Sequence, residues 1–211
     1  MLILISAGPT REPVDAVRFL SNRSTGKMGY ALAQAAVEAG HQVVLVSGPV
    51  ALPPVEGAEM VRVETAAEMA AAIKSRFPAC DAAVMAAAVA DYRPKHPVAN
   101  KLKKQEGGLL LELERTEDIL ASLGKTKQPG QILAGFAAET DDVEANALRK
   151  LQHKNLDFIA ANNVSEPGCG FAADTNSITV YAADGRRIPL PFGAKIEVAR
   201  QILKIITGEA K

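Results

Sequence analysis

The chain has 211 residues, of which 48% are hydrophobic and 23% charged, and its 24 basic and 24 acidic side chains cancel. A chain of this length can bury a full core as one domain, without disulfides or a structural metal. The absence of a basic excess disfavours a dedicated nucleic-acid-binding surface. We therefore expect one domain over residues 1–211 and no nucleic-acid partner.

The cysteine pattern and the apolar runs exclude further classes. Cys80 and Cys169 form no CxxC pair, which excludes the common zinc and dithiol spacings. The apolar start of the chain is short and has no basic lead, unlike a secretory signal. The longest apolar run, Ala82–Ala90, is far below the roughly 18 residues that a membrane helix needs. We expect a soluble, cytoplasmic protein without a membrane partner.

The first half of the chain predicts alternating strands and helices. Short apolar runs indicate strands, and apolar residues at helical spacing indicate helices. Thr65 with Glu68 three positions later forms a capping box that begins a helix. In chain order we expect strand Leu2–Ile5, helix Lys27–Ala39, strand Val43–Val46, strand Met60–Val63, helix Thr65–Phe77 and strand Ala82–Ala88.

The second half continues the alternation and ends with a hairpin. Its longest irregular stretch, Tyr92–Gly108, has the length of a functional or mobile loop. The alternation predicts an α/β fold with a mainly parallel sheet, helices on both faces, and an antiparallel hairpin near the C-terminus. We expect strand Leu109–Leu113, helix Glu117–Leu123, strand Ile132–Gly135, helix Asp141–Lys154, strand Phe158–Ala161, a hairpin of Ser177–Tyr181 with Arg187–Leu190, and helix Ile196–Ile206.

The segment Ser21–Gly29 is a candidate phosphate-binding loop. Ligands of doubly wound sheets bind where the strands end, and this segment runs into a predicted helix. Gly26 and Gly29 allow close backbone approach, and free amides at a helix start favour phosphate. The segment is neither a Walker A loop nor GxGxxG, because residue 21 is Ser and Met28 follows Lys27. An ordinary helix cap with packing glycines is the alternative.

A basic stretch follows the strand at Ala82–Ala88. Five cationic side chains and no acid occur between Arg93 and Gln105, a concentration of charge that suits a polyphosphate. Asp91, just before it, can hold a metal ion or a polar substrate group. A solvated loop whose lysines discourage strand pairing explains the same residues, and the pattern alone leaves both open.

Two further strand ends carry candidate ligand-binding residues. Phe136 follows a predicted strand and can stack on a base, although a single Phe is more often in a core. Lys150 and Lys154 share one helix face, where they also match the dipole of the helix C-terminus. Asn162 follows another strand, where turn chemistry is its alternative role.

Dinucleotide binding has a specific sequence test, which this chain fails. The strand Val43–Val46 ends in Ser47, with no acidic residue to hold a ribose. No Tyr-x-x-x-Lys pair is present either. The sequence therefore disfavours an NAD(P)-dependent reductase.

Taken together, these segments resemble the phosphopantothenoylcysteine synthetase (phosphopantothenate–cysteine ligase) family of coenzyme A biosynthesis, and its bacterial type. They occur in the order and at the spacing of that family, and they extend over most of the chain. In many bacteria this domain follows a flavin-dependent decarboxylase domain, which we expect to be absent here. The matching segments are Ala7–Pro13, Val17–Phe19, Ser21–Gly29, Ala86–Pro94, Lys101–Lys104, Gly135–Thr140 and Lys150–Asn162.

The resemblance implies a Rossmann-like fold and a two-step ligase reaction. The carboxylate of 4′-phosphopantothenate attacks the α-phosphate of a nucleoside triphosphate and releases pyrophosphate. The amine of cysteine then attacks the acyl-nucleotidylate, which gives the amide and a nucleoside monophosphate. The bacterial motifs favour CTP over ATP, with Mg²⁺ as cofactor. A homodimer with shared active sites is also implied.

The resemblance also assigns roles to individual residues. Asn22 and Lys101 would be catalytic, with Lys101 closing over the triphosphate from a mobile loop. The implied nucleotide-binding residues are Gly8, Ser24, Gly26, Gly29, Asp91, Lys101, Phe136, Lys150, Lys154 and Asn162. The implied positions around phosphopantothenate and the acyl intermediate are Asn22, Ala87, Ala88 and Asp91, with Asp91 also a possible metal ligand. A non-catalytic Rossmann-like nucleotide-binding module remains the alternative.

Overall fold

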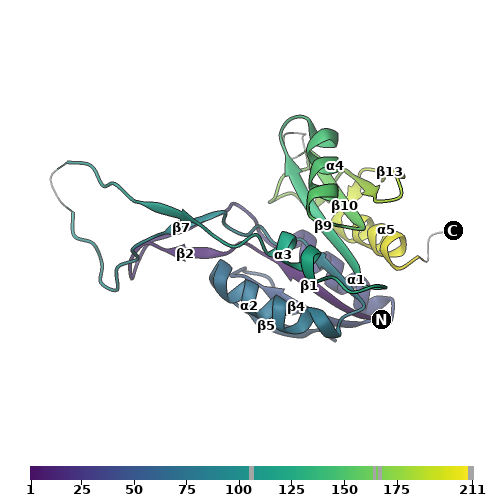
Figure 1. Cartoon of the computed structure of the whole chain (residues 1–211), viewed down its shortest axis with the longest axis horizontal. Helices are drawn as coiled ribbons and strands as arrows, with labels where there is room; N and C mark the ends of the chain where they lie inside the picture. The colour runs from purple at the N-terminus through teal and green to yellow at the C-terminus, as the bar shows by residue number, and fades with distance from the viewer. Residues whose placement is uncertain (105–106, 164, 166–167, 209–211) are drawn as a thin grey trace.

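The computed structural model describes residues 1–104, 107–163, 165 and 168–208. Its centre is an eight-stranded sheet with the order β13-β12-β10-β9-β6-β1-β4-β5 (Figure 1). Neighbours from β10 to β5 pair in parallel, whereas β12 and β13 are antiparallel. The strands are β1 Leu2–Ala7, β4 Gln42–Ser47, β5 Glu59–Arg62, β6 Ala82–Met85, β9 Ile132–Glu139, β10 Phe158–Asn163, β12 Ile178–Ala182 and β13 Arg187–Pro189.

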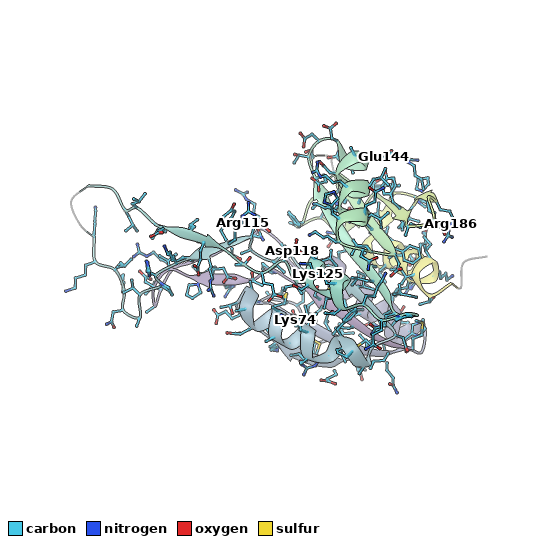
Figure 2. All side chains as sticks on the ribbon, in the orientation of Figure 1. Lys74, Arg115, Asp118, Lys125, Glu144 and Arg186 are labelled. Carbon is cyan, nitrogen blue, oxygen red and sulfur yellow. The ribbon has the colours of Figure 1, made fainter. Side chains whose placement is uncertain are left out.

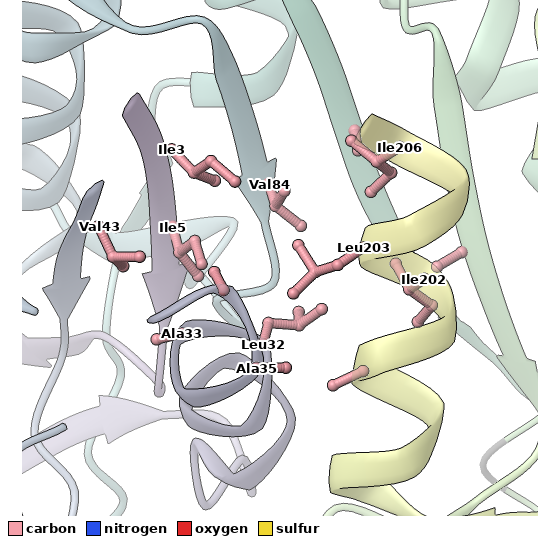
Figure 3. Close-up of a cluster of buried hydrophobic side chains, with 14 of the residues drawn as sticks. Ile3, Ile5, Leu32, Ala33, Ala35, Val43, Val84, Ile202, Leu203 and Ile206 are labelled. Carbon is pink, nitrogen blue, oxygen red and sulfur yellow. The ribbon is translucent and has the colours of Figure 1, made fainter. Parts of the chain in front are cut away.

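Helices cover both faces of this sheet, because its inner strands are apolar on both sides. On one face α1 and α5 pack together over Ile3, Ile5 and Val84 through Leu32, Leu203 and their neighbours (Figure 3). On the other face the core includes side chains of α2, α3 and α4. The helices are α1 Lys27–Glu38, α2 Ala66–Arg76, α3 Ile119–Thr126, α4 Val143–His153 and α5 Lys195–Thr207, and a 3₁₀ turn, Phe77–Ala79, follows α2.

The chain changes direction across the sheet between β1 and β6. From β1 it builds outward through β4 and β5, and it then returns to add β6, β9 and β10 on the other side of β1. A crevice forms at such a switch point, beyond the carboxyl ends of the two central strands. The fold therefore fixes one place where a ligand site is expected.

Short antiparallel ribbons form an arm that projects from the body of the molecule (Figure 1). One ribbon of the arm pairs β2 with β3, and the other pairs β7 with β8 across a long connection.

Outside the arm, a smaller antiparallel pair joins β11 to β14 before α5. The bounds are β2 Arg11–Pro13, β3 Phe19–Ser21, β7 Tyr92–Pro94, β8 Leu113–Arg115, β11 Thr175–Asn176 and β14 Gly193–Ala194.

The predicted fold class is confirmed, including the C-terminal hairpin of β12 and β13. The capping box at Thr65 is present, with its Oγ accepting a hydrogen bond from the Glu68 amide at 3.2 Å. Three predictions were wrong. The strand at Ala82–Ala88 ends at Met85 because the chain leaves the sheet at the switch point, Leu109–Leu113 is replaced by β8, and Tyr92–Gly108 contains β7. No helix among the described residues is long and apolar enough to cross a membrane.

Candidate active site

A cleft with a volume of about 360 Å³ opens at the switch point between β1 and β6. Its floor is formed by the residues that follow β6, and its walls are the start of α1, the start of α3, the end of β9 and the C-terminal half of α4. Predicted site residues that line it are Ser24, Gly26, Gly29, Ala87, Ala88, Asp91, Phe136, Lys150, Lys154 and Asn162. The topology thus brings together residues from five separated segments of the chain.

The loop before α1 is shaped for an anion. Gly26 begins the helix with a φ of 79°, a left-handed conformation that glycine adopts at little cost. The Gly26 amide donates to the Ser24 Oγ at 3.3 Å, and the first turn of α1 carries no acidic side chain. The following amides have no partner within the helix, so this end of α1 offers N–H donors and a positive dipole end to the cleft.

Gly29 has a packing reason as well as a place beside the cleft. A Cβ on Gly29 would lie 2.5 Å from the Cβ of Ala7 and 3.0 Å from the Ser6 carbonyl oxygen. The glycine therefore lets α1 approach β1 closely, as the third glycine of dinucleotide-binding loops does. The two interpretations left open by the sequence, packing and ligand approach, are compatible at this residue.

The opposite wall combines an aromatic ring with cations. Phe136 is half-buried against the core, and it lies inside β9 because this strand runs on to Glu139 rather than ending at Gly135 as predicted. Lys150 Nζ lies 2.5 Å from Glu139 Oε1, and Lys154 Nζ lies 2.8 Å from Asp118 Oδ2. Lys150, in the last turn of α4, and Lys154, which caps the helix, both line the cleft.

Asp118 connects this wall to the start of α3 (Figure 2). Its Oδ1 caps the helix by accepting a hydrogen bond from the Ala121 amide at 3.0 Å. Burial would raise the pKa of Asp118, but the hydrogen bonds from Lys154 and Ala121 outweigh it and hold that pKa below its ordinary value. The carboxylate is therefore ionised near neutral pH and holds Lys154 in position.

Asn162 lines the cleft and has a polar atom without a hydrogen-bond partner. The side chain is 9% exposed, and its Nδ2 donates to the Cys169 carbonyl at 2.8 Å. Its Oδ1 is buried and has no hydrogen-bond partner among the described residues. A buried acceptor without a partner is costly, so this atom indicates a ligand that donates a hydrogen bond, such as a hydroxyl or an amine.

Three predicted site residues do not line the cleft: Gly8, Asn22 and Lys101. Gly8 lies next to it, because its carbonyl accepts a hydrogen bond from the Ala88 amide at 2.9 Å. Asn22 holds the same segment from the other side. Its Nδ2 donates to the carbonyls of Ala88 at 2.9 Å and Val89 at 3.2 Å.

Lys101 is not among the residues that line the cleft, and it belongs to the long connection between β7 and β8. This connection forms the far end of the arm (Figure 1). The neighbouring residue is tethered to the arm. The Leu102 amide donates to Asp15 Oδ2 at 3.1 Å, and Arg18 donates to the Leu102 carbonyl at 3.2 Å. The structure thus places Lys101 away from the cleft of its own chain.

Sequence reasoning missed several residues of the cleft. Thr116 and Asp118 precede α3, Phe171 follows β10, and Lys195 begins α5. Asp118 could have been found as a helix cap before an apolar run. Phe171 and Lys195 lie in segments without a local motif, and only the folded chain brings them to the cleft.

The described residues contain no group of three or more His, Cys, Asp or Glu side chains that could hold a metal ion by themselves. Asp91 is exposed and lines the cleft. One carboxylate beside a polyphosphate site is a donor set that fits Mg²⁺, because this ion usually keeps waters and binds one or two carboxylates plus substrate phosphates.

The fold and the cleft define the class of protein: a doubly wound α/β domain with a candidate ligand site at its switch point. Residues 1–209 match the family described as DNA/pantothenate metabolism flavoprotein C-terminal domain, and the chain belongs to that family. The family resemblance inferred from the sequence motifs is therefore confirmed.

The similar proteins are consistent with this assignment. The chain is 51% identical over 210 residues to the coenzyme A biosynthesis bifunctional protein CoaBC of Bacillus subtilis strain 168. The matched region covers 99% of this chain and 52% of that protein. It is 46% identical to a cysteine/cysteine sulfinic acid decarboxylase of an unknown prokaryotic organism, over 97% of the chain and 58% of that protein. The chain thus spans about half the length of the curated relatives it matches.

A solved structure has the same fold over nearly the whole chain. The crystal structure of the C-terminal domain of a CoaBC protein superposes with a TM-score of 0.84, at 46% identity, and covers 99% of this chain and 94% of that domain. The matched region is therefore the C-terminal domain of these bifunctional proteins.

Proposed function

We propose that the chain joins 4′-phosphopantothenate to L-cysteine in coenzyme A biosynthesis, through an acyl-cytidylate formed from CTP. The observation that carries this proposal is the cleft at the switch point, which is lined by the start of α1, Phe136, Asn162, and Lys150 and Lys154 at the end of α4. Family membership and the relatives named above support the same reaction.

The cleft offers what the first half-reaction requires. Two anions must approach each other, and fixed positive charge and amide dipoles lower the cost of that approach. The amides at the start of α1 face one part of the cleft, and Lys150 and Lys154 face another. When the nucleotide is bound, Mg²⁺ held by its phosphates and Asp91 would supply further charge neutralisation.

The ligase reaction needs no nucleophilic side chain. The substrate carboxylate attacks the α-phosphorus, the bond to the leaving pyrophosphate breaks, and the amine of cysteine later displaces CMP. Both cysteines of the chain are buried, and burial raises the pKa of the Cys80 thiol, which disfavours a thiolate. We infer that the chain acts by positioning and electrostatics alone.

The arm supports the proposed homodimer with shared sites. Several large apolar side chains on it are exposed, including Leu110 at 94% and Val17 at 60%. Exposed apolar side chains concentrated on a projecting element indicate a surface that a partner covers. We propose that the arm of one subunit carries Lys101 to the cleft of the other.

A pyrophosphate-release assay tests the proposed function. The protein is mixed with Mg²⁺, 4′-phosphopantothenate, cysteine and one of CTP, ATP, GTP or UTP. We expect release with CTP above the other nucleotides, and accumulation of the acyl-cytidylate when cysteine is omitted. Binding of CTP without pyrophosphate release would instead support a non-catalytic nucleotide-binding module. Tighter binding of NADPH than of CTP would overturn the nucleotide assignment.

A further inference from the structure

A short segment without regular secondary structure, Cys169–Asp174, forms one edge of the cleft, and we call it the strap. Three of its residues, Cys169, Gly170 and Phe171, line the cleft. Half of the strap is exposed, namely Phe171 at 38%, Ala172 and Asp174, whereas Cys169 is buried. The strap joins no strand ladder. Its backbone bonds include those from the Ala173 amide to the Gly170 carbonyl at 3.2 Å and from the Lys195 amide to the Asp174 carbonyl at 2.9 Å, so its other carbonyls need side-chain donors.

Side chains hold the strap by its carbonyl groups. Asn162 Nδ2 donates to the Cys169 carbonyl at 2.8 Å, and Thr25 Oγ1 donates to the Phe171 carbonyl at 2.7 Å. Lys27 Nζ donates to the Ala172 carbonyl at 2.8 Å. These three donors come from the end of β10, the loop before α1 and the first residue of α1.

Lys195 holds the centre of the strap. Its Nζ donates to the carbonyls of Gly170 and Phe171, each at 3.2 Å, and to that of Ala173 at 2.5 Å. Together with the bonds from Asn162, Thr25 and Lys27, every carbonyl from Cys169 to Ala173 accepts a hydrogen bond from a side chain.

The environment of Lys195 is unusual for a lysine. The residue is 6% exposed, and its Nζ donates to carbonyl groups rather than to a carboxylate. Burial lowers the pKa of Lys195, and the nearby Lys27 ammonium lowers it further. Burial of a cation costs desolvation free energy. Three carbonyl acceptors offset this cost for Lys195, but only while the strap keeps this conformation.

We propose that Lys195 is a positioning residue for the nucleotide cleft, which it serves by holding the strap against Asn162 and the loop before α1. This inference rests on the proposed nucleotide site and adds to it a residue that no sequence motif marks. Lys195 ties α5, on one face of the sheet, to the segments that would contact the nucleotide.

The bonds explain why the strap and the phosphate-binding loop form a unit. Thr25 and Lys27 each hold the strap, and they flank Gly26, whose left-handed turn begins α1. Asn162 holds the strap through Nδ2 and keeps its Oδ1 for a ligand. If the strap moves away, Asn162 loses the bond that orients its amide, and the loop loses two anchors.

Replacing Lys195 by Met tests the role, because Met has similar length and no donor. We expect hydrogen exchange of the amides of residues 169–174 to accelerate in the free protein, and the Kd of CTP with Mg²⁺ to rise roughly tenfold. The KM for 4′-phosphopantothenate should change much less. Lys195→Arg, which retains donors and charge, should restore most of the CTP affinity.

Two further variants keep the test decisive. Lys204→Met removes an exposed lysine from the same helix and should match the wild type in exchange and in binding. Thr25→Val removes one strap bond from a half-buried surface position, so it provides a folded test if Lys195→Met does not fold. We expect an intermediate loss of strap protection and of CTP affinity.

The outcomes separate this proposal from the proposed function. A wild-type protein that binds CTP, with Lys195→Met and Thr25→Val binding it equally well, would overturn the positioning role alone. Unchanged hydrogen exchange of the strap in both variants, measured on the nucleotide-free protein, would also overturn the positioning role. A wild-type protein that binds no nucleoside triphosphate would overturn both.

Discussion

At the scale of single residues, the cleft is held in shape by polar side chains that bond to main-chain carbonyls. Asn22 is the clearest case, because its amide spans the carbonyls of Ala88 and Val89 at the edge of the cleft floor. Its residue type was predicted to matter from the family motif, as a donor to the reacting carboxyl. The structure adds that both donor hydrogens already have main-chain acceptors, so the catalytic role stays a prediction.

Asn22→Asp tests that role. A carboxylate in this place would face two carbonyl oxygens, and the loss of one donor to developing negative charge costs roughly 10²–10³ in rate. We expect a folded protein that fails to form the acyl-cytidylate or to convert it to the amide, measured by pyrophosphate release and by single-turnover product analysis. Steady-state rates equal to the wild type would remove Asn22 from the mechanism.

Gly29 gives a prediction about stability rather than catalysis. A Cβ at this position would lie 2.5 Å from the Ala7 Cβ, so α1 and β1 must separate to accept it. Overpacking of a well-packed core costs about 1–3 kcal/mol. We expect Gly29→Ala to lower the free energy of unfolding in urea by that amount. Gly108→Ala is the control, because a Cβ at Gly108 would meet no atom within 4 Å and its φ is not in the left-handed region, so little change in stability is expected.

At the scale of elements, the sequence predicted the long strands and helices but missed the arm. Apolar runs such as Val43–Val46 are recognisable because burial on both faces selects the same residue types along the strand. The strands of the arm have three residues each, too few to show a period, and β7 and β8 are separated by a long connection. Their pairing is set by the fold around them rather than by local sequence.

The same contrast holds for the candidate site. Asp91 and Phe136 could be placed because parallel strands end at one edge of a sheet, although β6 ends earlier and β9 ends later than predicted. Lys195 and Phe171 could not, because their role depends on contacts between distant segments. The family resemblance predicts Lys101 at the nucleotide, but no sequence pattern shows where the fold places it, and it does not line the cleft of its own chain.

Asp15 anchors the part of the arm that carries Lys101. It is 5% exposed, and hydrogen bonds from Arg18 are the main reason that its pKa lies well below the ordinary value. A carboxyl with a lowered folded-state pKa adds stability above its unfolded pKa, and this is lost as the pH falls through the folded pKa. We therefore expect the Asp15 carboxylate to stay ionised, and its contribution to stability to stay constant, between about pH 5 and 8.

Asp15→Ala should free the connection near Leu102. The expected result is faster hydrogen exchange of the Leu102 amide and a lower turnover, because Lys101 is no longer held at a fixed place. Exchange at this amide should show no acid-induced change near neutral pH in the wild type, after correction for the intrinsic rate. A sharp loss of protection there between pH 8 and about pH 5 would contradict the assignment to Asp15.

Lys101 is predicted to act as a clamp on the triphosphate. A flexible ammonium can close on the substrate and then release pyrophosphate, and the leaving group gains charge in the transition state. We expect Lys101→Gln to lower turnover by roughly 10²-fold, about 2.7 kcal/mol, with little change in melting temperature. Lys104→Gln is the matched control and should cost far less. Equal losses would indicate a diffuse basic patch instead.

At the scale of the whole molecule, the arm is the feature that a single chain leaves unexplained. Phe19 and Tyr92 are each 47% exposed on it, and Leu113 is 43% exposed. We expect a dimer of about twice 22.2 kDa by light scattering at micromolar concentration. Phe19→Asp should weaken the dimer, whereas Phe192→Asp, at an exposed position outside the arm, should not. A monomeric wild-type protein with full activity would contradict the prediction.

Shared active sites make a stricter prediction, which mixing two inactive variants can test. If each cleft uses its own Asn22 and the partner's Lys101, a heterodimer of Asn22→Asp with Lys101→Gln has one cleft with both native residues. Random exchange of subunits makes about half of the dimers mixed, so roughly a quarter of the wild-type activity should return. If Lys101 serves the cleft of its own chain, both clefts of the mixed dimer lack one residue and no activity returns. The placement of Lys101 on the projecting arm, outside its own cleft, favours the first result.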